Sequence, residues 1–560
     1  MTHNINIHVN QVGYMKEGKK LAILANCGGH FAVVDSSTDN VVYEGESFLA
    51  AEDGYGIGAM DEASGDIVSC CDFSSVVEVG EYYVELKGEG RSFSFRIMDG
   101  VYKVVKEALL KGLFYQRCGL ELVERYAGPW AHSVCHTELA SLYASPKIKL
   151  EVSGGWHDAG DYGRYVTAGA VSVADILLSY ELFGATYSDD IGIPESGNGV
   201  PDALDEARVE LAWLMKVQNK ENGGVYHKVT TKQFCGMIMP EEEQAELFIL
   251  PESAVATGDF AAVMSMASRV YRKYDDIFAT TMLIAAKEAW MWLEHNVDMP
   301  GFQNPQDVNT GEYGDPNSED ERFWAAVELY RTTGEEQYHN YIDQIVQTEV
   351  DKISFGWGKV GGYASFSYVR MVEQQEQIGN KDLAVLLKEE LLKQAEEYVL
   401  FARKDGYQVA ILPKQYRWGS NMGIMNSAQL LILAHLLTGK EEYYQVAVNQ
   451  LHYILGRNPM GVCYITGIGK NTVNSIHHRP SAADGVKSAV PGLLSGGPNW
   501  GLNDEVARNS IKPGTAPAKC FIDHVESYST NEIAIYWNTP ALFVAAYFDY
   551  VMESTLDIWK

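Results

Sequence analysis

Two carboxylates, Asp158 and Asp161, lie three residues apart in a glycine-rich stretch that also holds a tryptophan and a histidine. The stretch, residues 154–165, has the sequence Gly-Gly-Trp-His-Asp-Ala-Gly-Asp-Tyr-Gly-Arg-Tyr. Glycines at this density predict a tight loop that a ligand can approach closely. Apolar residues follow at once, so the loop should lead into a helix and place both carboxylates on one rim of a pocket. Helix capping, a common role of aspartate, explains one of the two carboxylates but not both.

A third candidate carboxylate, Glu532, begins a stretch that is otherwise apolar and continues through Ile533, Ala534 and Ile535. Apolar neighbours raise the pKa of a carboxyl group, which is the property that a general acid needs. The same position also suits the acidic member of a helix-capping box, so the local sequence leaves both roles open. Because Asp161 and Glu532 are far apart in the chain, only the fold can bring them together.

Two cysteines and two histidines precede or enter the same loop: Cys118, Cys135, His136 and His157. Two thiolates and two imidazoles make a tetrahedral zinc set without an open position, which is typical of a structural site. Zinc bound there would fix His157 and the backbone beside Asp158. The spacing is not that of a compact zinc finger. Buried cysteines and hydrogen-bonded histidines are therefore an equal alternative.

A second candidate metal site is the segment in which Glu195, Asp202 and Asp205 accompany glycine carbonyls. Calcium takes about six to eight oxygen ligands of these kinds. The start of a helix is the alternative, since Pro201 suits the first helical position and acidic residues interact favourably with the helix dipole there.

Two further residues suit the binding of a polar substrate. His477 and Arg479 lie in the Gly-, Asn- and Pro-rich region 457–518, and a loop of that length inside a compact domain is usually functional. A basic surface cluster is the alternative. Aromatic side chains offer apolar ring faces on which a ligand can stack, although any such residue could equally pack in a core. The aromatic candidates in or beside the predicted loops are Trp156, Tyr416, Trp418, Trp500 and Tyr528.

The elements that must position these residues fall into two parts. Residues 5 to about 97 contain short β-rich runs separated by turn signals, which predicts an immunoglobulin-like sandwich. Helical periodicity dominates afterwards, and two similar phrases at 330–338 and 436–444 indicate stacked helical hairpins. We therefore predict domains 1–98 and 99–560, the second a helical toroid. The predicted helices are 101–126, 165–185, 201–219, 257–274, 277–297, 319–334, 335–350, 363–374, 380–404, 420–438, 441–456 and 530–552.

Composition and charge narrow the class of partner. The chain of 560 residues has 44 basic and 75 acidic side chains, a net charge of 44 − 75 = −31, which argues against nucleic acid or an anionic membrane as partner. No run of about eighteen apolar residues indicates a membrane span. Eight scattered cysteines suit reduced thiols. We expect a cytoplasmic protein if the polar N-terminus is native, and a secreted one if a signal peptide has been removed.

Together these elements resemble family 9 of the glycoside hydrolases, the inverting cellulase-type enzymes. The resemblance covers nearly the whole chain. It is carried by phrases at residues 10–14, 115–119, 158–161, 416–421, 453–459, 464–467, 477–479 and 531–535. It implies a mainly α protein, with an (α/α)6 barrel behind a small immunoglobulin-like sandwich. It further implies that Asp161 is the general base, that Asp158 helps to hold the attacking water, and that Glu532 is the general acid.

The resemblance also implies residues for substrate and metals. Substrate binding is carried over to His477 and Arg479, and we add Trp418 and Tyr528 as stacking candidates. Structural zinc would be bound by Cys118, Cys135, His136 and His157, and calcium by Glu195, Asp202 and Asp205. Some members bind another calcium through a Ser-Asp-Glu cluster and an Asp shortly after a Trp. Here Asp320-Glu321 is present, but Trp357 is followed by Gly358-Lys359, which puts that site in doubt.

We therefore predict an inverting hydrolase of β-1,4-linked gluco-oligosaccharides and cellulose-derived glucans. One alternative is an exo-acting β-glucosidase or exo-β-glucosaminidase on short oligosaccharides, which the polar N-terminus favours. The other is a non-catalytic carbohydrate-binding protein, against which the intact Asp158, Asp161 and Glu532 argue. The sequence predicts neither the oligomeric state nor the number of sugar subsites.

Overall fold

The structure is a computed structural model that describes residues 6–49, 60–375 and 378–557. Internal contacts divide the chain into two compact units, one made of 1–112 with 395–560 and the other of 113–394. The predicted domain boundary at residue 98 falls between the last strand of the N-terminal part, which ends at Ile97, and the first helix, which begins at Lys103. The two units defined by contacts do not divide the chain at residue 98, so the boundary between the predicted domains stays a prediction.

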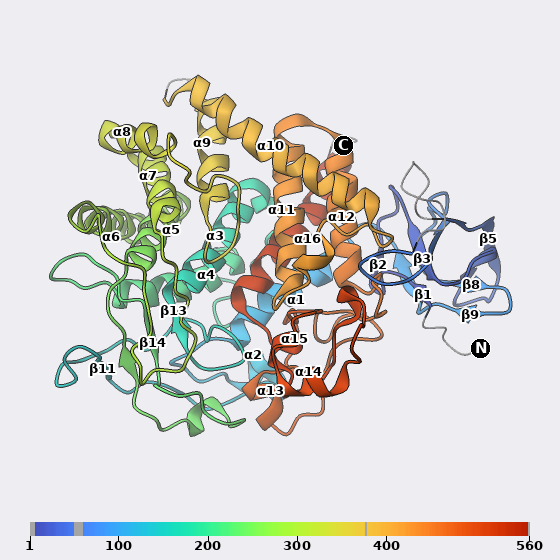
Figure 1. The fold of residues 1–560 in the computed structure, drawn as a ribbon, viewed down its shortest axis with the longest axis horizontal. Coiled ribbons are helices and arrows are strands. Elements are labelled where there is room, and N and C mark those ends of the chain that lie inside the picture. The colour runs from blue at the N-terminus through green and yellow to red at the C-terminus, as the bar shows by residue number, and fades with distance from the viewer. Residues whose placement is uncertain (1–5, 50–59, 376–377, 558–560) are drawn as a thin grey trace. The chain divides into compact units, whose positions relative to one another are not determined.

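The N-terminal part of the first unit is a sandwich of two β-sheets, drawn in blue in Figure 1. One sheet has the order β1-β3-β7-β6, and the other has the order β2-β10-β8-β4-β5, with β9 paired to β8. Apolar residues from both sheets, including Leu24, Phe31, Val33 and Phe95, form a single core. The strands are β1 (Ile7–His8), β2 (Gly13–Tyr14), β3 (Leu21–Ala25), β4 (His30–Asp35), β5 (Val41–Glu46), β6 (Phe48–Leu49), β7 (Val68–Asp72), β8 (Gly80–Leu86), β9 (Gly90–Arg91) and β10 (Phe95–Ile97).

The rest of the first unit is helical, with long loops between residues 455 and 534. Helix α11 packs against α12 and α16, and α12 also packs against α16. Helix α11 ends at Gly439, whose φ of 71° is the left-handed conformation expected of a glycine stop. The helices are α11 (Ser420–Thr438), α12 (Glu441–Ile454), α13 (Arg479–Ala483), α14 (Glu505–Ser510), α15 (Tyr528–Asn531) and α16 (Ile535–Asp557), while α1 (Lys103–Tyr115) and α10 (Lys381–Lys404) cross the division between the units.

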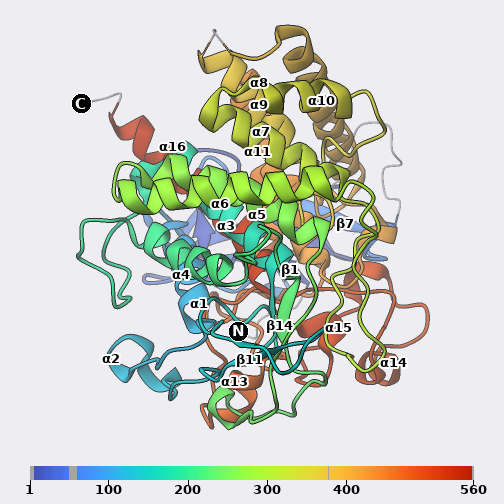
Figure 2. The ribbon, with the colours of Figure 1, turned by 90° about the vertical axis from the view of Figure 1, so that its left-hand side faces the viewer.

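The second unit combines paired helices with one small sheet (Figures 1 and 2). Helix α5 packs against α3, α6 and α7; α7 packs against α8 and α9; and α3 packs against α4. The helices are α2 (Glu124–Ala127), α3 (Val166–Phe183), α4 (Asp202–Lys216), α5 (Ala254–Tyr271), α6 (Asp276–His295), α7 (Glu319–Thr333), α8 (Glu336–Ile345) and α9 (Gly361–Gln375). The sheet, in the order β12-β11-β15-β14-β13, consists of β11 (Ala140–Leu142), β12 (Lys149–Leu150), β13 (Arg164–Tyr165), β14 (Lys228–Thr230) and β15 (Phe248–Ile249).

The helix predictions hold except at two places that matter for the site. The helix predicted over 101–126 ends at Tyr115, because the chain turns at Gly119, where a Cβ would lie 2.5 Å from the backbone nitrogen of Gly154. The helix predicted over 530–552 is interrupted before α16. The window Val166–Thr186 is long and apolar enough to cross a membrane, but 83% of it is buried, as in the core helix of a globular protein.

Candidate active site and metal centres

The loop at 154–165 lies in the second unit, and its backbone closes on itself around the two carboxylates. The amide of Asp158 donates to the carbonyl of Gly163 at 2.9 Å, and the amide of Gly163 donates to Oδ2 of Asp161 at 3.0 Å. Helix α3 has Tyr165 as its N-cap, without a side-chain capping bond. The capping alternative for Asp158 and Asp161 is therefore wrong, and both carboxylates belong to the loop.

Asp158 is almost fully buried and uses only one of its oxygens. Its Oδ2 accepts a 2.5 Å hydrogen bond from the hydroxyl of Tyr313, whereas its Oδ1 has no hydrogen-bond partner among the described residues. Burial raises the pKa of Asp158 well above its ordinary value, the charge of Asp161 adds to this effect, and the hydrogen bond from Tyr313 opposes it. The unpartnered Oδ1 is the atom that a bound water could use.

Tyr313 is a site residue that the sequence did not reveal. It lies 155 residues from Asp158 in the chain and has a φ of 48°, in the left-handed region. Its ring packs against Tyr165, with ring centroids 4.6 Å apart, and against Trp357 at 4.9 Å. The only local signal is a loop rich in Gly, Asn and Asp around it, which says nothing about its partner.

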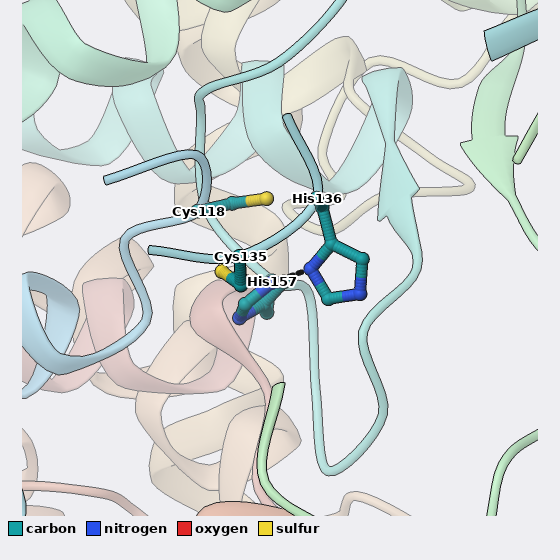
Figure 3. A group of neighbouring side chains, drawn as sticks. All are labelled: Cys118, Cys135, His136 and His157. Carbon is teal, nitrogen blue, oxygen red and sulfur yellow. Dashed lines mark hydrogen bonds between the residues drawn. The ribbon is translucent and has the colours of Figure 1, made fainter. Parts of the chain in front are cut away.

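The four predicted zinc ligands come together in one buried group (Figure 3). Their donor atoms all lie within 4.8 Å of one another. Backbone hydrogen bonds fix the positions of two of these ligands. The amide of Cys118 donates to the carbonyl of Gly155 at 2.8 Å, and the amide of His157 donates to the carbonyl of Gln116 at 2.7 Å. These bonds pair the segment after α1 with the carboxylate loop. Cys135 and His136 enter from the segment that follows α2.

The surroundings of this group suit a bound cation. Burial opposes ionisation of Cys118, but the hydrogen bond from Cys135 and the charge of Arg164 bring the pKa of its thiol well below the ordinary value. His136 Nε2 lies 3.1 Å from Oε2 of Glu243, while its Nδ1 faces Nε2 of His157 at 3.3 Å. A carboxylate on the outer ring nitrogen is the usual partner of a metal-bound histidine. Two thiols and two imidazoles, all buried, fit a closed tetrahedral metal site.

The acidic group has a different membership from the one predicted. Asp202 and Asp205 are joined by Asp189, with carboxylate oxygens within 4.8 Å of one another, and Oδ1 of Asp202 is buried without a hydrogen-bond partner among the described residues. Glu195 lies outside this group, because both its oxygens accept hydrogen bonds of 3.0 Å from the guanidinium of Arg117. The prediction of Glu195 is thus corrected to Asp189. Burial raises the pKa of Asp205 to about 6.

Glu532 lies in the first unit, in a three-residue break between α15 and α16. Its backbone is extended, with φ of −70° and ψ of 164°. It pairs with His477 in a parallel bridge, and its carbonyl accepts from the amide of Gly496 at 2.8 Å. Glu532 therefore lies in the first turn of neither α15 nor α16. The capping-box alternative is wrong, and so is the expectation that Glu532 opens the last helix.

Predicted substrate-binding residues gather beside this break. Trp418 is 45% exposed and Tyr528 is 37% exposed, with ring centroids 5.2 Å apart. The ring of His477 lies 5.8 Å from that of Tyr528, and its Nδ1 lies 2.6 Å from the carbonyl oxygen of Val525. Arg479 is buried at the start of α13. Among the other aromatic candidates, Trp500 is half exposed, whereas Trp156 and Tyr416 are buried in the core and present no surface to a sugar.

Two family models match the chain and together span both predicted parts. The model of the cellulase N-terminal ig-like domain matches residues 2–91, and that of glycosyl hydrolase family 9 matches residues 102–545. The chain belongs to glycosyl hydrolase family 9. A cellodextrinase of Butyrivibrio fibrisolvens is 36% identical over 96% of this chain and 98% of that protein.

Solved structures extend the comparison to the fold of this family 9 enzyme. The structure of AaCel9A in complex with cellobiose-like isofagomine has a TM-score of 0.89 at 35% identity, covering 98% of this chain and 100% of that one. A zinc-binding triple mutant of the family 9 endoglucanase J30 has a TM-score of 0.88 at 33% identity, covering 96% and 99%. The predicted family, the (α/α)6 barrel behind an immunoglobulin-like sandwich, and the class of glycoside hydrolase are confirmed. The roles of single residues stay predictions.

Proposed function

We propose that this family 9 enzyme hydrolyses β-1,4-glucosidic bonds in cello-oligosaccharides and cellulose-derived glucans with inversion at the anomeric carbon. The observation that carries the proposal is the carboxylate pair Asp158–Asp161 on one closed loop, where Tyr313 holds one oxygen of Asp158 and leaves the other unpartnered among the described residues. Two carboxylates side by side suit a water that one orients and the other deprotonates. Its similarity to a cellodextrinase and to an enzyme bound to a cellobiose-like compound supports this substrate class.

Inversion is a single displacement. Asp161 accepts a proton from the water as the water oxygen bonds to the anomeric carbon, while the bond from that carbon to the leaving oxygen breaks through an oxocarbenium-like transition state. Glu532 gives its proton to the leaving oxygen, and Asp158 orients the water. Each reaction consumes one water, and the two carboxyl groups return to their starting states by exchange with solvent.

Binding of the sugar is assigned to two exposed aromatic residues near Glu532 and to the less exposed His477 and Arg479. Trp418 and Tyr528 offer ring faces on which a pyranose can stack, since sugar rings have apolar faces. His477 and Arg479 would hydrogen-bond sugar hydroxyls. The strong net negative charge of the chain suits a neutral substrate of this kind.

Zinc is the metal that we assign to Cys118, Cys135, His136 and His157, and calcium the one that we assign to Asp189, Asp202 and Asp205. The donor chemistry supports both: soft sulfur and nitrogen in a closed set suit structural zinc, and hard carboxylate oxygens suit calcium. The zinc-binding mutant among the similar structures supports the first assignment. Bound zinc would supply a cross-link next to Asp158 and no reacting group.

Exo action on short oligosaccharides is the second candidate, favoured by the similarity to a cellodextrinase. Products of cellohexaose followed over time separate the two modes, because exo action releases one product size from the start. A steep fall in the viscosity of carboxymethylcellulose at low release of reducing sugar would show endo action and refute the exo form.

Proton NMR of a fresh digest of cellohexaose tests the mechanism. We expect the α-anomer of the new reducing end first, followed by mutarotation. If the β-anomer comes first, the enzyme retains configuration, and Asp161 is not the base. If the purified chain releases no sugar from any β-1,4-glucan or cello-oligosaccharide, the proposed substrate is wrong.

A further inference from the structure

Lys228, at the start of β14, is a fully buried lysine whose ammonium group donates to one loop and lies 5.5 Å from the ring centroid of Tyr165. Its Nζ donates to Oδ1 of Asn304 at 2.7 Å, to the carbonyl of Gly311 at 2.6 Å and to Oγ1 of Thr310 at 3.4 Å. An ammonium group has three hydrogens and no acceptor, so these three contacts use its full capacity. A buried cation is stable only with such partners. The buried ammonium group of Lys228 therefore needs the acceptors of the loop, and the loop in turn is held by Lys228.

The preceding residue, His227, joins the same loop. Its Nε2 lies 3.0 Å from the carbonyl oxygen of Glu312, and its ring stacks on Phe302 with centroids 3.7 Å apart. The loop also closes on itself, because the amide of Asn304 donates to Oε2 of Glu312 at 2.9 Å. Residues 302–313 thus form a closed loop that two neighbouring side chains attach to the start of β14, while Lys232 and Gln233 contact its outer part.

The far end of this loop carries Tyr313, whose hydroxyl donates to Asp158. The φ of 48° at Tyr313 is uncommon for a residue other than glycine and persists only where surrounding contacts hold it. Two contacts with the start of β14 lie just before Tyr313: the carbonyl of Glu312 faces His227, and the carbonyl of Gly311 accepts from Lys228. The position of the tyrosine hydroxyl therefore depends on the attachment of the loop to β14.

We propose that Lys228 is a positioning residue that clamps the 302–313 loop to strand β14 and so places Tyr313 against Asp158. The inference rests on the proposed function, because it assigns Lys228 a purpose in orienting Asp158. Lys228 acts through Tyr313 and is not itself a catalytic residue. Burial lowers the pKa of Lys228 to about 8, and the nearby charges of Asp161 and Glu312 oppose this.

The main variant is Lys228→Met, which keeps the length of the side chain but removes all three donors. It leaves Asn304 and Gly311 with buried acceptors that have lost their partner, so the loop should shift. Because small displacements of orienting groups cost much of the rate, we expect kcat on cellotetraose to fall about 10- to 100-fold, with KM changed less than about threefold. Lys228→Arg keeps the charge and donors and should restore part of the loss.

Lys232→Met is the matched control. Lys232 contacts the same loop through Asp307 at 2.6 Å, but both side chains are partly exposed. Its removal should change kcat less than about twofold, since exposed ion pairs contribute little. If Lys228→Met behaves like this control, the clamp is wrong.

A double-variant cycle with Tyr313→Phe separates positioning from general stability. If Lys228 acts through Tyr313, the two losses of kcat will not add, because the second change removes an interaction that is already lost. Additive losses would overturn the proposal. Asn304→Ala, at a half-buried position, removes one of the acceptors of Lys228 and should also reduce kcat. It replaces Lys228→Met in these tests if that variant does not fold.

Amide hydrogen exchange tests the clamp without any reference to activity. In Lys228→Met, peptides covering 302–313 should exchange faster, while those covering α5 keep their protection. Equal loss of protection in α5 would show general destabilisation and overturn the clamp. If the wild-type chain shows no glycosidase activity, the proposed function fails, and the exchange result still decides whether Lys228 holds the loop.

Discussion

The loop that carries Asp158 and Asp161 and the segment that carries Glu532 are both held by backbone pairing and by side chains, but the side-chain contacts fall at different places. In the loop, Tyr313 contacts the carboxylate of Asp158 itself, and in the other segment Ser495 and Asp523 contact Asn531, the neighbour of Glu532. Tyr313 and the Cys-His group contact the first segment. Glu532 instead pairs with His477 along the backbone and accepts from Gly496. A substitution at Tyr313, 155 residues away in the chain, should therefore act directly on the carboxylate that is proposed to hold the water.

The two segments also differ in how tightly their surroundings pack against them. A Cβ at Gly155 would lie 2.8 Å from the ring of Trp213, so the carboxylate loop packs tightly against α4. Near Glu532 the exposed rings of Trp418 and Tyr528 leave surface for a ligand. This difference fits the proposed roles, in which the first segment holds a water and the second binds a sugar. The predictions below test this division.

Asp161→Ala should have the largest effect, because it removes the base and leaves the loop's other ties intact. We expect kcat on cello-oligosaccharides to fall about 10²- to 10⁴-fold, the range of general acid–base catalysis. Added azide should restore turnover and give the α-glycosyl azide, identified by NMR, because it attacks in place of the water. A β-azide would instead require two successive displacements and would exclude inversion. Because a variant that lacks a retaining nucleophile would also give the α-azide, the anomer released by the wild-type enzyme separates a base from a nucleophile. Asp298→Ala, an exposed carboxylate of the same unit, should keep wild-type kcat.

Glu532→Gln should also cost about 10²- to 10⁴-fold on cello-oligosaccharides, but its loss depends on the leaving group. Dinitrophenyl glycosides need little protonation, so their rate should fall less than about tenfold. Release of dinitrophenol followed by absorbance gives the comparison. Equal losses on both substrates would remove Glu532 from the acid role. Glu526→Gln, an exposed carboxylate on the preceding loop, is the control and should change neither rate.

Sequence patterns predict the helices better than the hydrogen bonds and contacts between distant segments. The predicted helix 420–438 matches α11, Ser420–Thr438, because its ends are set by local glycines. The break at Glu532 escaped prediction, because the apolar pattern continues across it while His477 and Ser495 take over the backbone pairing. Hydrophobic periodicity records burial and carries no information on which backbone partner a residue has.

The site residues show the same limit. Cys118, Cys135, His136 and His157 could be predicted as a set, since their chemistry is unusual wherever it occurs. Tyr313 could not, because its role rests on a left-handed backbone and a contact across 155 residues. The acidic segment and the family resemblance placed Glu195 with Asp202 and Asp205, but its carboxylate instead accepts hydrogen bonds from Arg117. Which of several neighbouring carboxylates pairs with an arginine is decided by the fold and not by the local sequence.

Removal of the metal at the Cys-His group should affect the carboxylate loop through stability. We expect about one zinc per chain by elemental analysis, and a melting temperature lowered by several degrees after treatment with a strong chelator. Cys135→Ser should lose the zinc, whereas Cys463→Ser, a buried cysteine outside the group, should keep it. Glu243→Gln should weaken zinc binding about 10- to 100-fold, because it weakens the bond that orients His136.

Two results would contradict this assignment. Freshly purified protein without zinc would exclude a structural zinc site. Loss of activity on chelation without loss of stability would indicate a catalytic metal, which a closed set of four protein ligands does not provide for.

Calcium at Asp189, Asp202 and Asp205 should have the smallest effect, because this group touches the loop only through intermediates. The neighbouring Glu195 pairs with Arg117, whose backbone bridges to Trp156 in the loop. A ligand at about 100 times its dissociation constant stabilises a fold by about 2.7 kcal/mol. Calcium should therefore raise the melting temperature by a few degrees, with kcat changed less than about twofold. Asp205→Asn should abolish this shift, and Asp190→Asn, an exposed neighbour outside the group, should preserve it. A calcium-dependent kcat that persists in Asp205→Asn would place the ion elsewhere. A kcat that falls with calcium removal in the wild type but not in Asp205→Asn would show that the acidic group, too, helps to hold the base.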